Sequence, residues 1–501
     1  MYSSDSVVKK TSVREEVQHM NNGFTRNFRP LEILSEDQIE TIHHGTLKVL
    51  QEVGVRIMHD GALKIFEQHD CTVDFDKKCV CIPPHVVDEC VRRTPSSFRV
   101  KARESKNDLL IGGDRVYFRN FPGMDTADLD TWERRAPTRK EYYDFITVLD
   151  ALPNVHALSG HPYFGFEGIP EVMKISEGEA AKVRNSSKIQ IVTHSKDSEI
   201  FSIRIVKATG GEAFGVSHPS SPLSYSNEAV EALLRFAKAG FPIHVGSGLI
   251  MGKSGPATIA GSTVSNDAEV LALVVLIQLA HPGTRLVVND YVHAHDSRSG
   301  VPAFGDIASS LHAAAFHQIF RWYGIPSCTS LSGVSSSERI DFQLAYEKTI
   351  PALLAALAGS NIVDLHSSIN AELKAHPVQA IIDDDIAGMI GRCLEGVAVN
   401  EDTLALDIIA KVGHLPGHFL HESHTKKWDN QEQYIPQVAE RLSYSDWLAS
   451  DKRSVLECAK EKHDEILSTH KTTPLTSEQE TEIEAILKEQ AVYYSKQNIL
   501  T

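Results

Sequence analysis

Several short apolar runs in the middle of the chain end in histidine, which can act as an acid, a base or a metal ligand near neutral pH. His293-Ala-His295-Asp296 adds a His-x-His pattern of the kind that chelates zinc. These residues allow a metal-dependent hydrolase, although Asp364 is the only acidic residue evident at the end of a later run. The histidines that end separate runs are His161, His194, His218, His293 and His366.

A loop rich in small residues, Gly252–Gly261, follows the apolar run Pro242–Ile250. Glycine lets the backbone approach a ligand closely, but an ordinary turn between a strand and a helix has a similar composition. Lys253 follows the first glycine instead of preceding a serine or threonine after the last, which excludes a phosphate-binding P-loop. The loop leads into an apolar helix that we expect over Ala268–Ala280.

These residues need a scaffold that brings the ends of the runs together. From Thr138 onward, runs of strand length alternate with helical stretches. This alternation predicts a parallel sheet, and the length favours a (β/α)8 TIM barrel over an open doubly wound sheet. Active sites of such barrels lie on the loops after the carboxyl ends of the strands. The expected strands are Val155–His161, Lys188–His194, Phe214–Ser220, Pro242–Ile250, Arg285–Tyr291, Pro326–Leu331 and Asn361–Ser367, with the eighth near Val412–Leu420.

The other segments are expected to surround the barrel. Ser35-Glu-Asp-Gln38 resembles a capping box at the start of a helix. Leu109–Ile111 and Val116–Phe118, on either side of Gly112-Gly-Asp114, predict a β-hairpin. The expected division is an N-terminal arm at residues 1–30, an α+β cap segment at 31–135, the barrel at 136–420 and a C-terminal helical extension packed on the barrel at 421–501.

Composition limits the kinds of partner. The 66 acidic and 50 basic residues give a net charge of −16, which argues against binding to nucleic acid. The longest apolar run is too short to span a bilayer, and the N-terminus has no apolar signal region, so we expect a cytoplasmic protein without a membrane partner. Cys71, Cys79, Cys81 and Cys90 lack the spacing of a zinc ribbon and are expected to be reduced, packed thiols.

The chain resembles the trimethylamine methyltransferase family over most of its length, in particular members that lack pyrrolysine and act on quaternary amines such as glycine betaine. The resemblance implies a (β/α)8 barrel and a corrinoid-dependent methyltransferase, whose cobalamin, as Co(I), is carried by a cognate corrinoid protein. The motifs that carry it are Ser221-Pro-Leu-Ser-Tyr-Ser-Asn-Glu228, the loop Gly252–Gly261, Asn266-Asp-Ala-Glu269, Asp341-Phe-Gln-Leu-Ala-Tyr-Glu347 and His424-Thr-Lys-Lys-Trp428.

Trimethylamine-specific members of this family carry pyrrolysine just before the segment that matches Asp341-Phe-Gln343. This chain has the ordinary residues Ser335-Ser-Ser-Glu-Arg-Ile340 there, so we assign no catalytic residue beyond marking the region of Glu338. A quaternary amine is already charged and leaves as a neutral amine, whereas trimethylamine must first be activated. The expected reaction moves a methyl group from glycine betaine to Co(I) and releases dimethylglycine. The alternatives are proline betaine, carnitine or another betaine as the substrate, a metal-dependent hydrolase, and a binding protein that has kept the barrel.

A quaternary ammonium has no N–H to donate and is bound by aromatic faces, while the carboxylate of a betaine needs hydrogen-bond donors. The aromatic residues nearest the predicted barrel mouth are Tyr163, Phe164, Tyr291, Phe304 and Trp322. The candidate donors are His161, His218, His293, Arg298 and Arg321. We expect no bound metal, and we expect a homo-oligomer.

Overall fold

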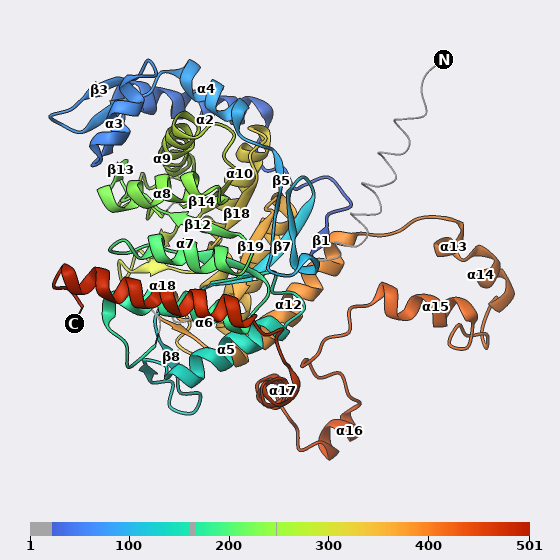
Figure 1. Cartoon of the computed structure of the whole chain (residues 1–501). Helices are drawn as coiled ribbons and strands as arrows, with labels where there is room; N and C mark the ends of the chain where they lie inside the picture. Colours follow the sequence, from blue (N-terminus) through green and yellow to red (C-terminus); the bar gives the residue numbers. More distant parts are fainter. Residues whose placement is uncertain (1–22, 160–165, 247, 501) are drawn as a thin grey trace, which may run out of the picture.

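Eight parallel strands form a closed barrel in the structure, a computed structural model that describes residues 23–159, 166–246 and 248–500 (Figure 1). The last strand pairs with the first and closes the barrel, which confirms the predicted fold class. In order around the barrel, the strands are β7 (Arg115–Asn120), β10 (Ala157–Leu158), β11 (Ile189–Val192), β12 (Ala213–Ser217), β14 (Ile243–Val245), β15 (Leu286–Asp290), β18 (Ser327–Thr329) and β19 (Ile362–His366).

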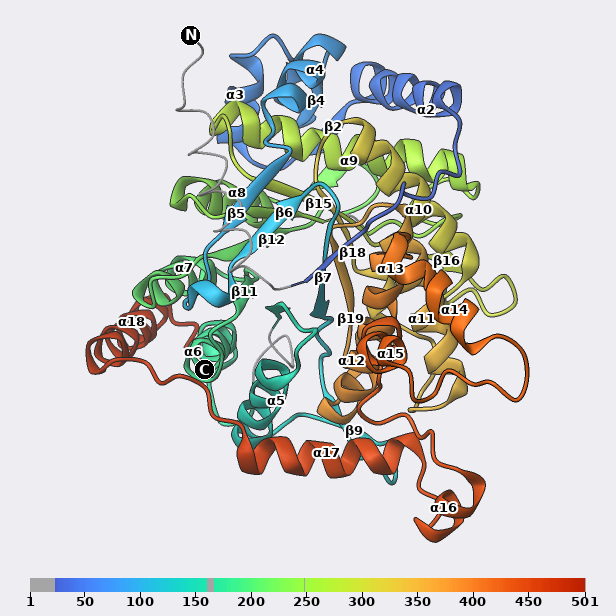
Figure 2. The same ribbon diagram turned by 90° about the vertical axis from the view of Figure 1, so that its right-hand side faces the viewer.

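A helix follows each strand and packs outside the barrel (Figures 1 and 2). These helices are α5 (Arg139–Ala151), α6 (Lys174–Asn185), α7 (Ser198–Ala208), α8 (Asn227–Ala239), α9 (Ile259–Ala280), α10 (Ile307–Trp322), α11 (Phe342–Ala358) and α12 (Pro377–Glu395). Two-stranded ribbons follow three of the strands: β8 (Thr126–Ala127) with β9 (Arg134–Arg135), β16 (Ala294–His295) with β17 (Pro302–Ala303), and β20 (Ser368–Ile369) with β21 (Lys374–Ala375).

The eighth barrel strand is not where we expected it. Residues near 412–420 do not form a strand, because α14 (Leu406–Val412) occupies the start of that stretch and a loop follows it. The missing strand is β7, from the segment that we assigned to the cap. Every residue of β7 after Arg115 is buried, as is typical of a strand in a parallel sheet covered on both faces.

The expected hairpin between Leu109–Ile111 and Val116–Phe118 is also wrong. β6 (Leu109–Gly112) pairs instead with β5 (Ser97–Val100), and this hairpin packs against residues of the barrel interior such as Phe214 and Val287. The backbone N–H of Glu212, just before β12, donates to Lys101 O at 2.7 Å. The hairpin therefore closes the amino end of the barrel and leaves the carboxyl end open.

Helix α9 starts earlier than we expected. The Thr258 hydroxyl accepts from the backbone N–H of Gly261 and caps the helix, whereas Asn266 and Asp267, which precede the expected start at Ala268, are buried inside it. Among the described helices, α9 is long and apolar enough to cross a membrane, but most of it is buried inside the protein. It is the central helix of the largest hydrophobic core.

The N-terminal α+β segment packs on α9 (Figure 1). Ser35 and Gln38 form the predicted capping box at the start of α2 (Glu36–Lys48), which continues as a π-helical turn, Val49–Val53. The other helices of this segment are α3 (Asp60–Glu67) and α4 (Pro84–Arg93), and its sheet contains β2 (Val55–Ile57), β3 (Thr72–Asp74), β4 (Cys79–Cys81) and, from the barrel region, β13 (Ser224–Tyr225).

Glu269 connects two of the motifs that carry the family resemblance. Its buried carboxylate accepts from the Ser221 hydroxyl at 2.7 Å and from the Leu223 N–H at 2.8 Å, and its carbonyl accepts from the Tyr225 hydroxyl. These bonds fix the loop before β13 to helix α9. The two motifs therefore help to hold the N-terminal segment on the barrel, because β13 pairs with β2 of that segment.

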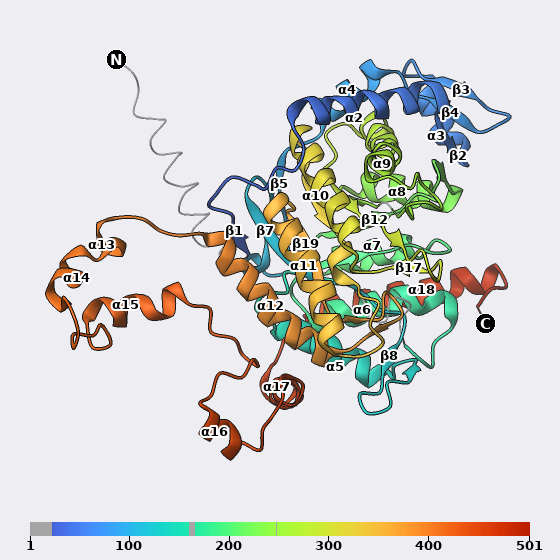
Figure 3. The same ribbon diagram turned by 180° about the vertical axis from the view of Figure 1, so that it is seen from behind.

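The C-terminal part has two different environments. Helices α17 (Val455–Thr469) and α18 (Ser477–Lys496) pack on the barrel helices α12, α5, α6 and α7. The short helices before them have no buried residue and project from the body (Figure 3). These are α13 (Glu401–Leu404), α14, α15 (Ser423–Glu432) and α16 (Tyr444–Ala449).

Candidate active site

A cavity of about 330 Å³ lies at the carboxyl ends of the barrel strands. Its lining comes from all around the barrel, which is the usual position of the active site in this fold. The described residues that line it are Arg119, Phe121, Pro122, Gly123, Met124, Ser159, Ile191, Val216, His218, Pro219, His244, Gly248, Asn289, Tyr291, Ser330, Asp364 and Glu372. We call it the mouth cavity.

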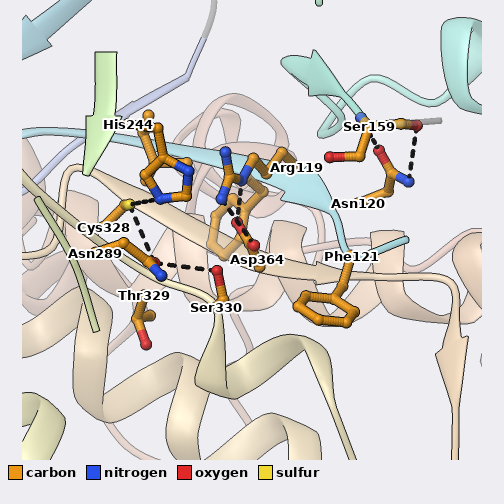
Figure 4. Close-up of polar contacts among 12 residues, drawn as sticks. Arg119, Asn120, Phe121, Ser159, His244, Asn289, Cys328, Thr329, Ser330 and Asp364 are labelled. Carbon is orange, nitrogen blue, oxygen red and sulfur yellow. Dashed lines mark hydrogen bonds and ion pairs between the residues drawn. The ribbon is translucent and has the colours of Figure 1, made fainter. Parts of the chain in front are cut away.

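A buried ion pair lies on one side of the mouth cavity. The Arg119 guanidinium on β7 contacts the Asp364 carboxylate on β19 through two N–H groups, of which Nη2 lies 2.9 Å from Oδ2 (Figure 4). Both side chains are almost fully buried. Because the two charges compensate each other, the pair adds no net charge to the cavity.

A chain of hydrogen bonds lies on the neighbouring strands (Figure 4). Cys328 Sγ lies 3.0 Å from His244 Nε2 and 3.3 Å from Asn289 Oδ1, and the Ser330 hydroxyl donates to the same Asn289 oxygen at 3.0 Å. Burial, followed by the nearby Arg119 charge, holds the pKa of His244 well below its ordinary value, so the ring is neutral. These hydrogen-bonded side chains thus supply neutral polar groups inside the barrel.

Two aromatic rings form part of the cavity wall nearer its opening. Phe121 and Tyr291 stack with their ring centroids 5.6 Å apart and their planes inclined by 20°. The Tyr291 hydroxyl donates to Glu372, an exposed residue between β20 and β21, at 3.4 Å. Aromatic faces beside a carboxylate are the groups that bind a methylated ammonium, which cannot donate a hydrogen bond.

His218 follows β12 and lines the cavity, as we predicted. Part of its side chain is open, yet desolvation by the surrounding protein, followed by the charges of His194 and Arg119, lowers the pKa of His218 to about 4. The imidazole is therefore neutral at physiological pH and can offer one N–H donor to a ligand.

His293 and Phe304 lie behind the cavity wall. The His293 ring packs edge-on against Tyr291 at 4.3 Å and against Phe304 at 4.7 Å between ring centroids, and neither residue lines the cavity. Of the predicted set, the structure thus brings His218 and Tyr291 into the site, with His293 and Phe304 supporting Tyr291. His161, Tyr163 and Phe164 lie outside the described residues.

Arg321 and Trp322 are not at the barrel mouth, which corrects our expectation. They occupy the last turn of α10, and because this helix runs antiparallel to the strands, its end lies beside the amino end of the barrel. Arg321 donates to Ala358 O at 2.9 Å, and Trp322 is 43% exposed and packs on His43. Glu338 does not line the cavity either. Its exposed carboxylate forms an ion pair with Lys374 at 2.9 Å.

The histidines that suggested a metal site lie in different environments. His293 packs among aromatic rings, whereas His295 Nδ1 lies 2.7 Å from Met251 O. Arg298, a candidate carboxylate donor, is exposed and paired with Asp296. In the part of the chain that the structure describes, no three His, Cys, Asp or Glu side chains converge to hold a metal ion.

Sequence reasoning missed most of the residues that lie deepest in the cavity. Arg119 and Phe121 were overlooked because their strand was assigned to a hairpin outside the barrel, and His244 lies within a strand instead of at its end. Asn289, Ser330 and Asp364 stand at expected strand ends. The apolar run Val116–Phe118, followed by Arg119 and Asn120, had the pattern of the other barrel strands and could have identified β7.

The closed barrel, with aromatic and buried polar side chains around one small cavity at its carboxyl end, defines a TIM-barrel enzyme that acts on a small molecule. The sequence matches the profile of the trimethylamine methyltransferase (MTTB) family over residues 5–492. The chain belongs to this family, and it is a methyltransferase.

Among its relatives, the glycine betaine methyltransferase of Desulfitobacterium hafniense strain Y51 is 30% identical over 470 residues, which cover 91% of this chain and 96% of the relative. A trimethylamine methyltransferase, MttB, from another strain of that species is 27% identical and covers 91% of this chain and 93% of its own length. The crystal structure of monomethylamine methyltransferase from Methanosarcina barkeri has a similar fold, with a TM-score of 0.50, 13% identity and coverage of 90% of this chain and 92% of that chain.

Proposed function

We propose that the chain transfers a methyl group from glycine betaine to a corrinoid protein and releases dimethylglycine. The observation that carries this proposal is the stacked pair Phe121 and Tyr291 in the mouth cavity, with the Glu372 carboxylate beside it. These groups match a trimethylammonium cation, since aromatic faces and a nearby negative charge attract it and no donor from the ligand is needed. The similarity to a relative named glycine betaine methyltransferase supports the same choice of substrate.

The corrinoid is expected to remain on a separate protein. A cavity of about 330 Å³ has room for a small amine, whereas a corrinoid macrocycle is far larger. The open carboxyl end of the barrel leaves a route by which such a partner can reach the methyl group. When bound there, the corrinoid supplies a nucleophilic Co(I) that accepts the methyl cation.

The residues of this chain have binding and orienting roles in this proposal. The aromatic pair holds the ammonium and turns a methyl group toward the opening, and the surrounding protein excludes water. The departing amine is neutral and takes no proton. The low pKa of His218 fits this requirement, because a neutral imidazole with a pKa of about 4 is a poor proton donor at physiological pH.

The test is methyl transfer from a panel of amines. Purified protein is incubated with Co(I) cobalamin and, separately, with glycine betaine, proline betaine, carnitine, choline or trimethylamine, while the cobalamin spectrum is followed. We expect glycine betaine to give methylcobalamin fastest. Transfer only from trimethylamine, or from none of the five, would refute the proposal.

Three further expectations stay predictions. They are that the chain forms a homo-oligomer, that it works in the cytoplasm, and that it divides into an arm, a cap segment, a barrel and a C-terminal extension packed on the barrel. Measuring the molar mass of the purified protein in solution tests the first of them.

A further inference from the structure

The mouth cavity has two levels along the barrel axis. Arg119, His244 and Asn289 belong to the strands themselves and lie deep, whereas Phe121 and Tyr291 follow the ends of β7 and β15 and lie nearer the opening. The deep level contains polar groups and the outer level contains aromatic rings. A ligand with one charged and one methylated end therefore has two distinct environments available.

The deep level has hydrogen-bonding atoms that are not yet satisfied. Asn289 is 0% exposed and His244 is 3% exposed. Within the described ranges, Asn289 Nδ2 and His244 Nδ1 have no hydrogen-bond partner. An unpaired buried polar group costs about 1–3 kcal/mol, so two such atoms in the lining of one cavity point to a ligand that pairs with them.

The existing hydrogen bonds of Asn289 and His244 limit which of their atoms can donate to a ligand. The Asn289 oxygen already accepts from the Ser330 hydroxyl, which leaves the amide N–H groups as the available side of Asn289. The thiol of Cys328 has one proton, which it can donate either to Asn289 Oδ1 or to His244 Nε2. In the second arrangement the proton of the neutral His244 ring is on Nδ1, and His244 also becomes a donor. Both unpaired atoms can thus act as donors at the same time.

An acceptor with two oxygens is the natural partner of two such donors, and Arg119, whose charge is compensated by Asp364, lies in the same lining. We infer that the deep level of the mouth cavity, formed by Asn289 and His244 beside Arg119, binds the carboxylate of a betaine and so selects zwitterionic over simply cationic quaternary amines. This inference rests on the proposed function. It makes Asn289 and His244 determinants of substrate specificity.

This assignment also sets the direction of the ligand. With the carboxylate held deep, the trimethylammonium group lies at the level of Phe121 and Tyr291, and its methyl groups face the opening from which the corrinoid protein approaches. The opposite orientation would bury the methyl groups and leave the carboxylate beside Glu372, where two negative charges would repel. Because Arg119 and Asp364 neutralise each other in the deep level, the charge of Glu372 near the opening favours one orientation.

The experiment compares two ligands that share the trimethylammonium head. Glycine betaine ends in a carboxylate, and choline ends in a hydroxyl. By calorimetry, the unchanged protein should bind glycine betaine about 10- to 100-fold more tightly than choline, the range expected for hydrogen bonds to a charged group. Equal or tighter binding of choline would overturn the inference, and this comparison needs no variant to fold.

Single substitutions show which residues cause the preference for glycine betaine over choline. Asn289→Leu, which has nearly the same shape without the amide, should weaken glycine betaine binding about 10- to 100-fold and change choline binding little. His244→Phe is the second variant and should act in the same direction. Phe121→Ala is the matched control, because loss of the aromatic face should weaken both ligands alike. Melting curves show which variants are folded.

The outcomes separate this inference from the proposed function. If the protein binds both ligands and Asn289→Leu or His244→Phe weakens both equally or neither, the carboxylate site is refuted, and the quaternary-amine function stands. If the unchanged protein binds neither ligand, the proposed function fails and the inference fails with it. Selective loss of glycine betaine binding supports both.

Discussion

Arg119 on β7 and Asp364 on β19 are register partners across the seam where the barrel closes, and their side chains form a buried two-point ion pair. The backbone pairing that closes the sheet and the ion pair that lines the cavity thus involve the same two residues. Fold and site are coupled at this position.

Breaking this pair on one side should be strongly destabilising. Asp364→Asn leaves the Arg119 charge buried without its counter-charge, and such a change costs about 3–5 kcal/mol. Replacing both residues together, with Arg119→Met and Asp364→Leu, should restore part of the stability because no unpaired charge remains. Urea unfolding of the single and double variants measures both effects. If Asp364→Asn is as stable as the parent, the ion pair does not stabilise the closed barrel.

The aromatic pair should control the affinity for quaternary amines. Phe121→Ala or Tyr291→Ala removes a desolvated cation–π contact of about 2 kcal/mol, which corresponds to roughly thirty-fold weaker binding of glycine betaine. Trp322→Ala is the control, since Trp322 lies at the other end of the barrel. Calorimetric titration of folded variants measures the change. Equal affinities for all three variants would place the ammonium site elsewhere.

Methyl transfer should not need a general acid. A quaternary amine carries a permanent charge and leaves as a neutral amine, so the rate should show no fall at alkaline pH from the loss of an essential proton. At acid pH, His218 stays neutral until the pH approaches its pKa of about 4. Stopped-flow measurement of methylcobalamin formation across the pH range tests this. A steep loss of rate above neutral pH, with the fold intact, would mean that an acid takes part.

Acid should destabilise the folded chain partly through His293. Burial, reinforced by His312, lowers the pKa of His293 to about 3. Because the unfolded histidine takes up a proton below its ordinary pKa of about 6.5 and the folded one does not, stability is full above that value and is lost as the pH falls. The loss amounts to about 2 kcal/mol between about pH 6.5 and about pH 5.

Replacement of this histidine tests the assignment. His293→Phe keeps an aromatic ring between Tyr291 and Phe304 but cannot titrate, so the fall in unfolding free energy between about pH 6.5 and about pH 5 should be smaller by about 2 kcal/mol. Urea unfolding at the two pH values measures the difference. The same pH dependence in the variant and the parent would show that His293 is not responsible.

Local patterns in the chain were sufficient to predict much of the architecture. The alternation of apolar runs with helical stretches predicted seven of the eight barrel strands, and the capping box at Ser35 predicted the start of α2. His218 and Tyr291 were found because they follow strand ends. Each of these features depends on neighbours in the sequence, and helix caps and strand periodicity are properties of short segments.

The deepest part of the site depends on contacts between distant segments. Arg119 meets Asp364 only because β7 pairs with β19, 245 residues away, and a local pattern can mark β7 as a strand but cannot identify its partner. His244, Asn289 and Cys328 come from three neighbouring strands, β14, β15 and β18, whose side chains meet only when these strands pair in one sheet. Trp322 was expected at the barrel mouth, but the direction of α10 places it at the amino end of the barrel. Closure of the barrel and helix direction are long-range properties, which is why they decided the composition of the site.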